Sequence, residues 1–469
     1  MDQVYELGMW YWDKMDNLDY LMNKLKQKGI DDAVLTFSTN TSRQIKFADN
    51  KIVKTGVEEL SNIGIFVVKD KKILTTSCQD LIGEEGLSKM NDGLTELNKK
   101  NIDKLIEKIF ESLKLMQPKK DYYGINEKRF KYKEVRDGYD SKVVDIDDID
   151  YAEKGINSAL KEGAKRTNGI LEVHDFKVNL LTSSDISFTE KKSELYFSIR
   201  SLIEKDESGH MNALSTRLNK FNVEEAGKIS GEIASDSKNP SKGKRGSYDI
   251  LFGPMAISPL LNVIGESASI FSVESGLSFF TGKQGKNVGS NKITIYDDGS
   301  LDGGVNSTKA DSEGVATRKN TLIENGIFKQ YLHNTSTAKK YKTESTGNAG
   351  LISPSPWNIV VKKGNLNLTE MIKKVKNGIY VTNVWYTRFA NYHTGDFSTI
   401  PRDGAFLIKN GKIIGSLKNI RISENILRLL KNVDGVENKT RYLRSWEART
   451  PVMTPHILVK NCKITVPTS

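Results

Sequence analysis

Two Asn-Gly pairs, each set between short apolar runs, constrain the fold of this chain more than any other feature. They stand in LIENGIF (Leu322–Phe328) and in LIKNGKI (Leu407–Ile413). Both residues of an Asn-Gly pair tolerate a positive φ, so this arrangement is the strongest short-range signal for a tight β-hairpin. The run Ile457–Val466 alternates apolar and polar side chains and predicts a last strand. We therefore expect the last third of the chain to be mostly antiparallel β structure.

The first half of the chain alternates between helical and β-type patterns. Apolar residues at helical spacing predict a helix capped by Asp16 and ended by Gly29, and another with its apolar face on Ile102–Leu113. A third helix is expected over Tyr151–Lys165. Short β-type runs predict strands at residues 33–38, 43–48, 63–68, 72–77, 177–183 and 194–203. These patterns favour small modules that combine helices with antiparallel strands.

Composition shifts divide the chain into three parts. Residues 236–247, DSKNPSKGKRGS, contain four basic residues and no apolar side chain besides the proline, which marks a boundary. We expect an N-terminal helix and antiparallel-sheet module over 1–117, a linker arm and middle α/β module over 118–240, and a β-rich C-terminal domain over 241–469. That domain is predicted to open with a strand and then a helix whose first position is Pro259. The predicted fold class is α+β.

Charge and hydropathy narrow the classes of function. The net charge of +11 rests on 55 Lys and only 15 Arg, and basic side chains are interleaved with acidic ones, as in Glu153–Lys165. This pattern favours a solvated surface over a nucleic-acid-binding face, which is typically rich in arginine. No apolar run approaches the ~20 residues of a membrane-spanning helix. Cys78 and Cys462 stand in no C-x-x-C pair. We therefore expect a cytoplasmic protein with reduced thiols and neither a membrane nor a nucleic-acid partner.

Histidine is scarce, which limits histidine-based metal and acid–base chemistry to five positions. His174, His210, His333, His393 and His456 are all more than ten residues apart, so the zinc motifs H-E-x-x-H and H-E-x-x-x-H are absent. The G-x-S-x-G and Walker motifs are absent as well. Convergence of His333, His393 and His456 on a metal stays open as a weaker alternative.

Several motifs of the C-terminal part stand in an order found in a known family. Ala310–Gly350 contains D-x-E-G (Asp311–Gly314), the first Asn-Gly hairpin, a Tyr/Leu-rich strand, a short helical run and Thr346–Asn348. In this order they resemble the TldD/PmbA family, whose members are also called modulators of DNA gyrase or TldD- and TldE-type metallopeptidase subunits. Thr394–Ser398, followed by the second hairpin, resembles the TldE/PmbA branch. The resemblance spans most of the chain.

Within that family, the TldD-type subunit carries H-E-x-x-x-H on the helix after the strand that opens its C-terminal domain, and a cysteine as a further zinc ligand. The resemblance places these six positions at Leu261–Glu266, LNVIGE in this chain. Leu261 and Glu266 stand where the histidines are expected and Asn262 where the glutamate is expected. Cys462 does not match the cysteine motif. Leucine has no donor atom for zinc, and an asparagine amide cannot act as a general base at neutral pH.

The resemblance implies a TldE/PmbA-like subunit of a zinc metalloprotease that acts on unfolded peptides. Such a chain has no catalytic or metal-binding residue of its own, and zinc is expected in the TldD-like partner of a heterodimer. A strand edge could hold an extended peptide by β-augmentation. One alternative is an independent peptide-binding or regulatory homodimer without protease activity. Another is a metallopeptidase with unusual ligands such as His333, His393, Glu266 or Cys462.

Six residues are candidates for contact with a peptide in a cleft. They are Asn262, Glu266, Thr394, Gly395, Asp396 and Ser398. Asn262 and Glu266 are four residues apart, so they share one face of a helix. They could equally form a solvated face or bond to each other. The segment 394–398 could be a loop cap that holds the β domain together, or part of a peptide-binding wall.

Overall fold

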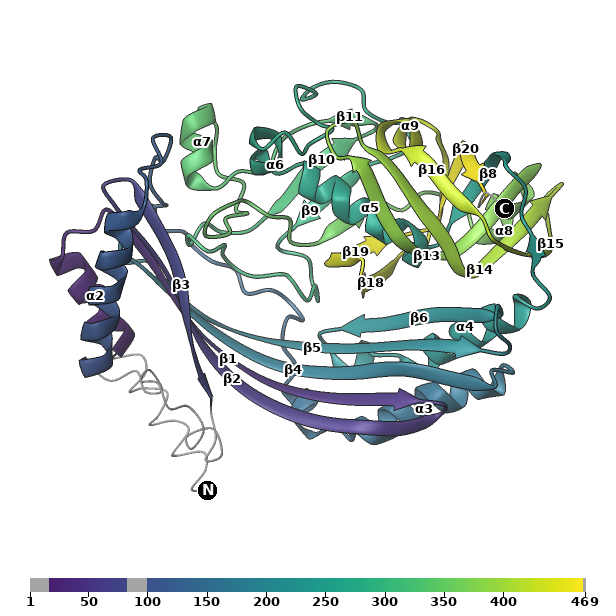
Figure 1. The fold of residues 1–469 in the computed structure, drawn as a ribbon, viewed down its shortest axis with the longest axis horizontal. Helices are drawn as coiled ribbons and strands as arrows, with labels where there is room; N and C mark the ends of the chain where they lie inside the picture. The colour runs from purple at the N-terminus through teal and green to yellow at the C-terminus, as the bar shows by residue number, and fades with distance from the viewer. Residues whose placement is uncertain (1–16, 82–98, 467–469) are drawn as a thin grey trace.

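The structure is a computed structural model that describes residues 17–81 and 99–466. The predicted helix cap Asp16 lies outside these residues. With 23% of the chain in helices and 43% in strands, most of them paired antiparallel, the fold is α+β as predicted. One long curved sheet lies against a C-terminal part that contains two further sheets (Figure 1). No described helix is both long and apolar enough to cross a membrane.

The curved sheet has six antiparallel strands in the order β3–β2–β1–β4–β5–β6. Its strands are β1 (Asp32–Ala48), β2 (Lys51–Lys69), β3 (Lys72–Leu81), β4 (Arg166–Thr182), β5 (Ser187–Leu202) and β6 (Ser208–Ser215). The runs predicted at 33–38 and 43–48 are one strand, because the polar residues between them pair with β2 on one side and β4 on the other. Asp49 and Asn50, both at positive φ, form the turn that lets β2 begin well before its predicted start at residue 63.

Strands from the expected first and second modules meet in this one sheet, because β1 bonds to β4 over almost its whole length. The division of the chain at residues 117 and 240 stays a prediction.

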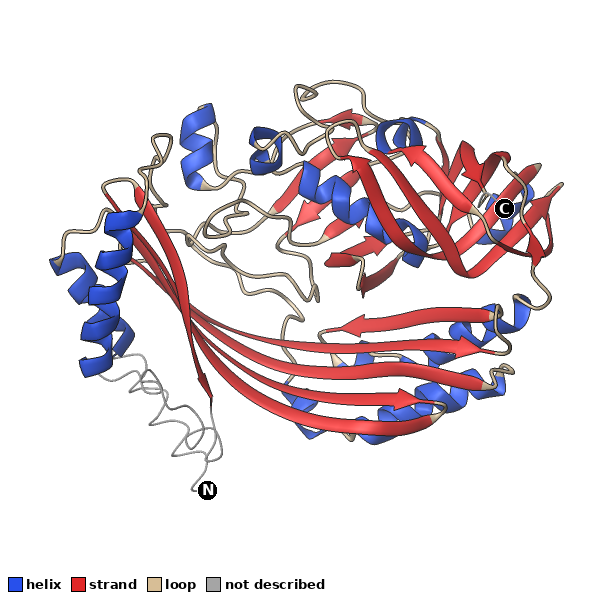
Figure 2. Cartoon of the chain, viewed as in Figure 1, coloured by secondary structure: helices blue, strands red, loops and turns tan. Residues whose placement is uncertain are grey.

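Helices cover the outer face of the curved sheet (Figure 2). α3 (Asp148–Lys161) and α4 (Val223–Asp236) pack on apolar side chains of β4 and β5. The helix over residues 17–27 and α2 (Lys99–Leu115) pack on β1 and β2. Gly155 allows α3 to approach the sheet closely, since a Cβ at this position would lie 2.3 Å from the ring of Phe197.

The C-terminal part contains two sheets. The first has the order β11–β10–β9–β12–β19–β18, and the second has the order β13–β8–β20–β16–β14–β15–β7. The first consists of β9 (Ile295–Asp298), β10 (Lys319–Glu324), β11 (Ile327–Phe328), β12 (Ile359–Val361), β18 (Arg441–Ser445) and β19 (Ala448–Thr454). The second consists of β7 (Ser241–Lys242), β8 (Gly246–Phe252), β13 (Asn377–Asn391), β14 (Asp396–Lys409), β15 (Lys412–Lys418), β16 (Arg421–Asn425) and β20 (Ile457–Thr465), with β17 (Val433–Val436) paired to β20. Because β13 also pairs with β14, five of these strands close into a ring.

Both predicted Asn-Gly hairpins are confirmed. Asn325-Gly326 joins β10 to β11, and Asn410-Gly411 joins β14 to β15, with all four residues at positive φ. Four short helices lie in the connections: α6 (Ile270–Glu274), α7 (Thr335–Tyr341), α8 (Leu368–Lys373) and α9 (Ile426–Lys431).

The long helix of this part, α5 (Pro254–Ser267), packs against β13 and β19 and belongs to the largest apolar cluster of the molecule. The prediction that Pro259 opens this helix is wrong, because the helix begins at Pro254 and contains Pro259. A proline nitrogen cannot donate to the carbonyl of Met255. That carbonyl instead accepts a hydrogen bond from Ser258 Oγ at 3.1 Å.

The segment 118–136 has no regular structure and joins the curved sheet to the C-terminal part. Tyr122 Oη donates to Asp32 Oδ2 on β1 at 2.7 Å. Further along, Tyr132 Oη donates to the carbonyl of Gly314 at 2.7 Å. Tyr122 thus attaches this segment to the curved sheet, and Tyr132 attaches it to the C-terminal part.

The strand β5 provides the second connection. Its inner side chains Glu190, Glu194 and Arg200 all reach the C-terminal part. Glu190 accepts from Lys309 N at 3.0 Å, Glu194 pairs with Arg444, and Arg200 Nε lies 2.7 Å from Asp403 Oδ1. Because residues at even spacing on a strand share a face, one strand attaches the C-terminal part at three points.

Candidate functional site

The helix α5 carries the first two predicted site residues, Asn262 and Glu266. Asn262 is buried; its amide nitrogen donates to Glu266 Oε1 at 3.0 Å, and its amide oxygen accepts from Thr450 N at 3.0 Å. Asn262 therefore fastens β19 to α5. Desolvation raises the pKa of Glu266, against the hydrogen bond from Asn262 and the charge of Arg449. The two side chains are bonded to each other, and their contact with a peptide stays a prediction.

The side chains at the positions of the expected zinc motif do not fit a zinc ion. Leu261 is 1% exposed, packs in the apolar core and has no donor atom. Both polar atoms of Asn262 are engaged, so Glu266 would be the one ligand, whereas zinc sites use three or four protein ligands. Within residues 17–81 and 99–466, no three His, Cys, Asp or Glu side chains are arranged to hold a metal.

The histidines are dispersed over the molecule. His333 is buried near Tyr341, and desolvation lowers its pKa to about 4. His393 is exposed between β13 and β14, and His456 follows β19. The alternative in which these three histidines converge on a metal is therefore wrong. Cys462 is 1% exposed on β20, where burial raises the pKa of its thiol.

Three of the other predicted site residues form a cap at the junction of β13 and β14. Thr394 Oγ1 donates to Asp396 Oδ2 at 2.5 Å, and Asn425 Nδ2 donates to Asp396 Oδ1 at 2.9 Å and to Thr394 O at 2.8 Å. Gly395, at φ 82°, supplies the carbonyl that accepts from Ile426 N at 2.9 Å. Asn425 is the N-cap of α9, so the cap ties this helix to the turn.

The fourth, Ser398, lies on β14 and accepts a hydrogen bond from Arg421 Nη1 of the neighbouring strand β16 at 2.9 Å. No hydrogen bond or ion pair of the described residues joins the cap or Ser398 to Asn262 or Glu266. The structure thus brings the predicted residues together in two separate groups.

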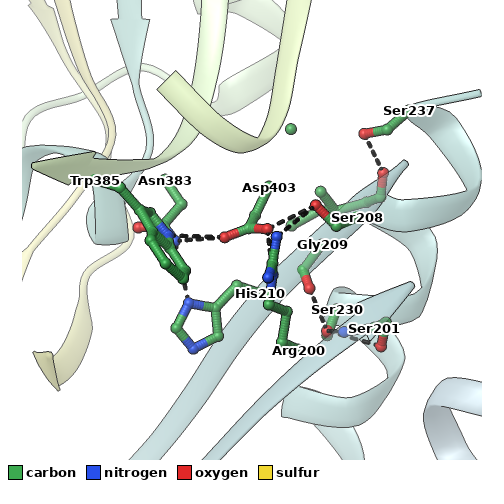
Figure 3. Close-up of polar contacts among 12 residues, drawn as sticks. Arg200, Ser201, Ser208, Gly209, His210, Ser230, Ser237, Asn383, Trp385 and Asp403 are labelled. Atoms are coloured by element: carbon green, nitrogen blue, oxygen red, sulfur yellow. Dashed lines mark hydrogen bonds and ion pairs between the residues drawn. The ribbon is translucent and has the colours of Figure 1, made fainter. Parts of the chain in front are cut away.

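A buried polar cluster lies where the inner face of the curved sheet meets β13 and β14 (Figure 3). The side chain of Asp403 is fully buried and accepts from Arg200 Nε at 2.7 Å, Ser208 Oγ at 2.6 Å and Trp385 Nε1 at 2.9 Å. Burial opposes ionisation of this carboxyl. The charge of Arg200, with the hydrogen bonds from Ser208 and Arg200, outweighs burial and holds the pKa of Asp403 below its usual range.

His210 extends this cluster. Asn383 Nδ2 lies 3.1 Å from His210 Nδ1 and donates to Asp403 Oδ2 at 3.2 Å. Because an amide nitrogen only donates, Nδ1 accepts and Nε2 carries the hydrogen toward Ser198 Oγ, at 2.9 Å. Burial lowers the pKa of His210, in keeping with this neutral form. Sequence reasoning missed the cluster, and its one local signal was the polar residues at alternate positions of β5.

A cavity of about 550 Å³ opens between α4 and the ring of strands. Its lining includes His210, Tyr380 and His456. His456 Nδ1 lies 2.6 Å from Glu437 Oε2, and His456 Nε2 lies 3.1 Å from Tyr380 Oη. Burial acts to raise the pKa of Glu437, but the hydrogen bond and charge of His456 lower it. Both ring nitrogens of each lining histidine thus have a partner from the protein itself.

Comparison with known proteins places this geometry in a family. Residues 245–466 match the PmbA/TldA metallopeptidase C-terminal domain. An uncharacterised protein of Methanocaldococcus jannaschii is 30% identical over 341 residues, which are 70% of this chain and 77% of that protein. The chain belongs to the PmbA/TldD family.

A further relative and a solved structure are also similar to this chain. A metalloprotease of Methanothermobacter thermautotrophicus is 30% identical over 260 residues, 53% of this chain and 56% of that protein. TldE from Thermococcus kodakarensis has the same fold, with a TM-score of 0.82 and 23% identity over 96% of this chain and 99% of its own. The PmbA/TldD family is a metallopeptidase family. The chain spans about half the length of the metalloprotease.

In this member of the family, the motif D-x-E-G holds the loop before α7. Asp311 accepts hydrogen bonds from the backbone N–H groups of Glu313, Val315 and Ala349, each at 2.9 Å. Glu313 accepts from Thr335 N at 3.1 Å, where α7 begins. Desolvation raises the pKa of both buried carboxyl groups, and the charge of Asp311 raises the pKa of Glu313 further. The contacts of this motif are thus structural.

We expect Glu313→Gln to reduce the pH dependence of stability. A carboxyl whose pKa is higher in the folded chain than its unfolded value of about 4.3 binds its proton more tightly when folded. The stability it contributes is complete below that unfolded value and is lost as the pH rises toward the folded value. Between pH 5 and pH 8, thermal unfolding should therefore show a larger loss of stability in the wild type than in the variant. Glu127→Gln, at an exposed position, should follow the wild type, and parallel curves for all three proteins would contradict the expectation.

Proposed function

We propose that this chain is a TldE-like, non-catalytic subunit of a zinc metalloprotease. It would pair with a TldD-like subunit that holds the zinc, and the pair would act on unfolded peptides. The observation that carries this proposal is the environment of residues 261–266. A core leucine, an amide with both polar atoms bonded and a single carboxylate occupy the positions expected for the metal motif.

The family supports the class of reaction. The curated relatives include proteins named metalloproteases, and the matched C-terminal domain is described as a metallopeptidase domain. In this chain, the helix α5 follows β8 as the resemblance predicts. At the position expected for the first metal-binding histidine, it carries Leu261, which packs in the apolar core. A chain of this kind can contribute a peptide-contacting surface and shape the site, while the chemistry at the scissile bond takes place on its partner.

Reconstitution tests the proposal. The purified chain would be mixed with a separately encoded homologue that carries H-E-x-x-x-H, and cleavage of an unfolded, fluorescently quenched peptide would be followed with time. We expect no cleavage by this chain alone, cleavage by the mixture, and co-elution of the two chains in size-exclusion chromatography. A homologue whose motif glutamate is replaced by glutamine is the matched control and should still co-elute without cleaving.

Two results would overturn the proposal. One is zinc bound at one equivalent per chain together with cleavage by this chain alone, which would make it a metallopeptidase with unusual ligands. The other is a stable homodimer that binds the peptide but neither co-elutes with the homologue nor changes its activity. That result would establish the independent peptide-binding protein instead.

A further inference from the structure

Two half-exposed aromatic side chains stand together on the strands that pack against α5. Trp446, in the turn between β18 and β19, is 54% exposed, and Tyr386, on β13, is 46% exposed. Their ring centroids are 6.2 Å apart and their planes meet at 77°. Large aromatic side chains with free faces are the usual anchors of binding surfaces, because each can bury much apolar area at a small cost in side-chain entropy.

A strained backbone conformation at Tyr386 and a buried carboxylate, Glu447, hold the pair in position. Tyr386 adopts φ 57° where the register between β13 and β14 shifts, a backbone conformation that is unfavourable for an aromatic residue. Glu447, whose side chain is 6% exposed, holds the shifted strand by accepting from Thr387 N at 3.1 Å and from Thr387 Oγ1 at 2.8 Å. Backbone strain that the surrounding structure maintains is found most often at functional sites.

The ring of Trp385 packs against both rings of the pair. Its ring meets the ring of Trp446 edge to face at 5.8 Å, and its indole N–H donates to the buried Asp403. The guanidinium groups of Arg200 and Arg402 lie 5.0 Å and 4.8 Å from the ring of Trp385. Trp385 is thus occupied by protein contacts, whereas Trp446 and Tyr386 keep free surface.

The surroundings of the pair carry positive charge. Arg388, 65% exposed, lies 5.7 Å from the ring of Tyr386 and has a distant ion pair with Glu447 at 3.7 Å. Arg402 and Arg449 are exposed, and neither forms an ion pair within the described part of the chain. Each of these guanidinium groups can donate two parallel hydrogen bonds to a carboxylate.

We propose that Tyr386 and Trp446, together with Arg388 and Arg402, form a binding site for acidic, aromatic-containing segments of unfolded peptides. An aromatic side chain of the peptide enters the corner between the two nearly perpendicular rings, and acidic neighbours in the peptide pair with the arginines. The peptide nature of the ligand rests on the proposed function. The preference for acidic and aromatic residues rests on the geometry and charge of this surface.

Single-stranded nucleic acid is the other class of ligand that combines aromatic stacking with arginine contacts. The arrangement here favours a peptide. Successive bases need ring faces that are exposed one after another along a basic groove, whereas the planes of these two rings meet at 77°.

Fluorescence anisotropy of labelled peptides with the full chain tests the proposal. The probe is a fluorescein-labelled peptide of four Gly-Asp-Phe repeats, compared with Gly-Lys-Phe and Gly-Asp-Ala repeats of the same length. We expect the first peptide to bind most tightly and the double variant Tyr386→Ala/Trp446→Ala to weaken its binding at least ~10-fold. The double variant Arg388→Ala/Arg402→Ala should weaken it and reduce its salt dependence. Tyr341→Ala, at an equally exposed tyrosine of α7 (46%), should bind like the wild type.

The variant Tyr386→Phe/Trp446→Phe keeps the rings and should retain binding, which separates loss of the site from loss of folding. Equal affinity for the acidic and basic peptides, unchanged affinity in the Tyr386→Ala/Trp446→Ala variant, or stronger binding of a single-stranded oligothymidylate would overturn the proposal. This experiment uses the chain alone. Failure of the reconstituted protease therefore leaves its result standing, and failure here leaves co-elution and cleavage with the partner subunit unaffected.

Discussion

Replacing Asp403 with alanine should lower the free energy of unfolding by about 3–5 kcal/mol, the usual cost of breaking a buried ion pair from one side. The change removes the acceptor of Arg200 Nε, Ser208 Oγ and Trp385 Nε1 and leaves these donors unsatisfied. Asp403 also stands at φ 56°, which alanine tolerates less well than aspartate. Equilibrium urea unfolding, followed by circular dichroism, measures the loss.

Two controls separate the burial of this carboxylate from its position between the layers. Asp206 pairs with Lys418 across the same two layers but is exposed, so Asp206→Ala should cost much less than Asp403→Ala. Asp403→Asn keeps the shape and the tolerance for positive φ, but it removes the charge and replaces one accepting oxygen with an amide nitrogen that cannot accept. Its loss should therefore fall between the two. Similar losses for Asp206→Ala and Asp403→Ala would show that the buried cluster does not hold the layers together.

Leu261→His should lower the free energy of unfolding by about 2–5 kcal/mol, although it restores the residue type expected at the first metal position. Leu261 is 1% exposed within the largest apolar cluster. An imidazole there loses apolar contact area and buries a polar ring without a partner. Thermal and urea unfolding measure the effect.

Glu266→His is the control that tests whether the cost of Leu261→His comes from burial in the core. Glu266 is exposed as a residue, although its carboxylate accepts a hydrogen bond from Asn262. Restoring histidine at the second metal position should therefore cost about 1 kcal/mol, the usual net contribution of one hydrogen bond. Leu261→Met, which conserves volume, should cost less than about 1.5 kcal/mol. If Leu261→His were tolerated as well as Glu266→His, position 261 would have room for a ligand and the argument from core packing would fail.

Local sequence signals predicted the hairpins, the amphipathic helix α2 and the α+β class, because turn φ preferences and side-chain periodicity act over a few residues. These signals gave wrong bounds where contacts with other parts of the chain determine the secondary structure. Polar residues in the middle of β1 are extended because β2 and β4 pair with them from both sides. The start of α5 was misplaced because Ser258 Oγ satisfies the carbonyl that Pro259 cannot, which lets the helix run through a proline.

For the candidate site, the sequence by itself determined that residues 261–266 contain neither histidine of the expected zinc motif and offer one carboxylate, Glu266, since donor atoms belong to side chains whatever the fold. It also placed the chain close to the PmbA/TldD family through motifs that are contiguous. Only the tertiary structure decided that Asn262 fastens β19, that Arg200 and Asp403 meet, and that Tyr386 and Trp446 form one surface. Burial, strain and charge pairing arise between residues distant in sequence, and local preferences carry no record of such contacts.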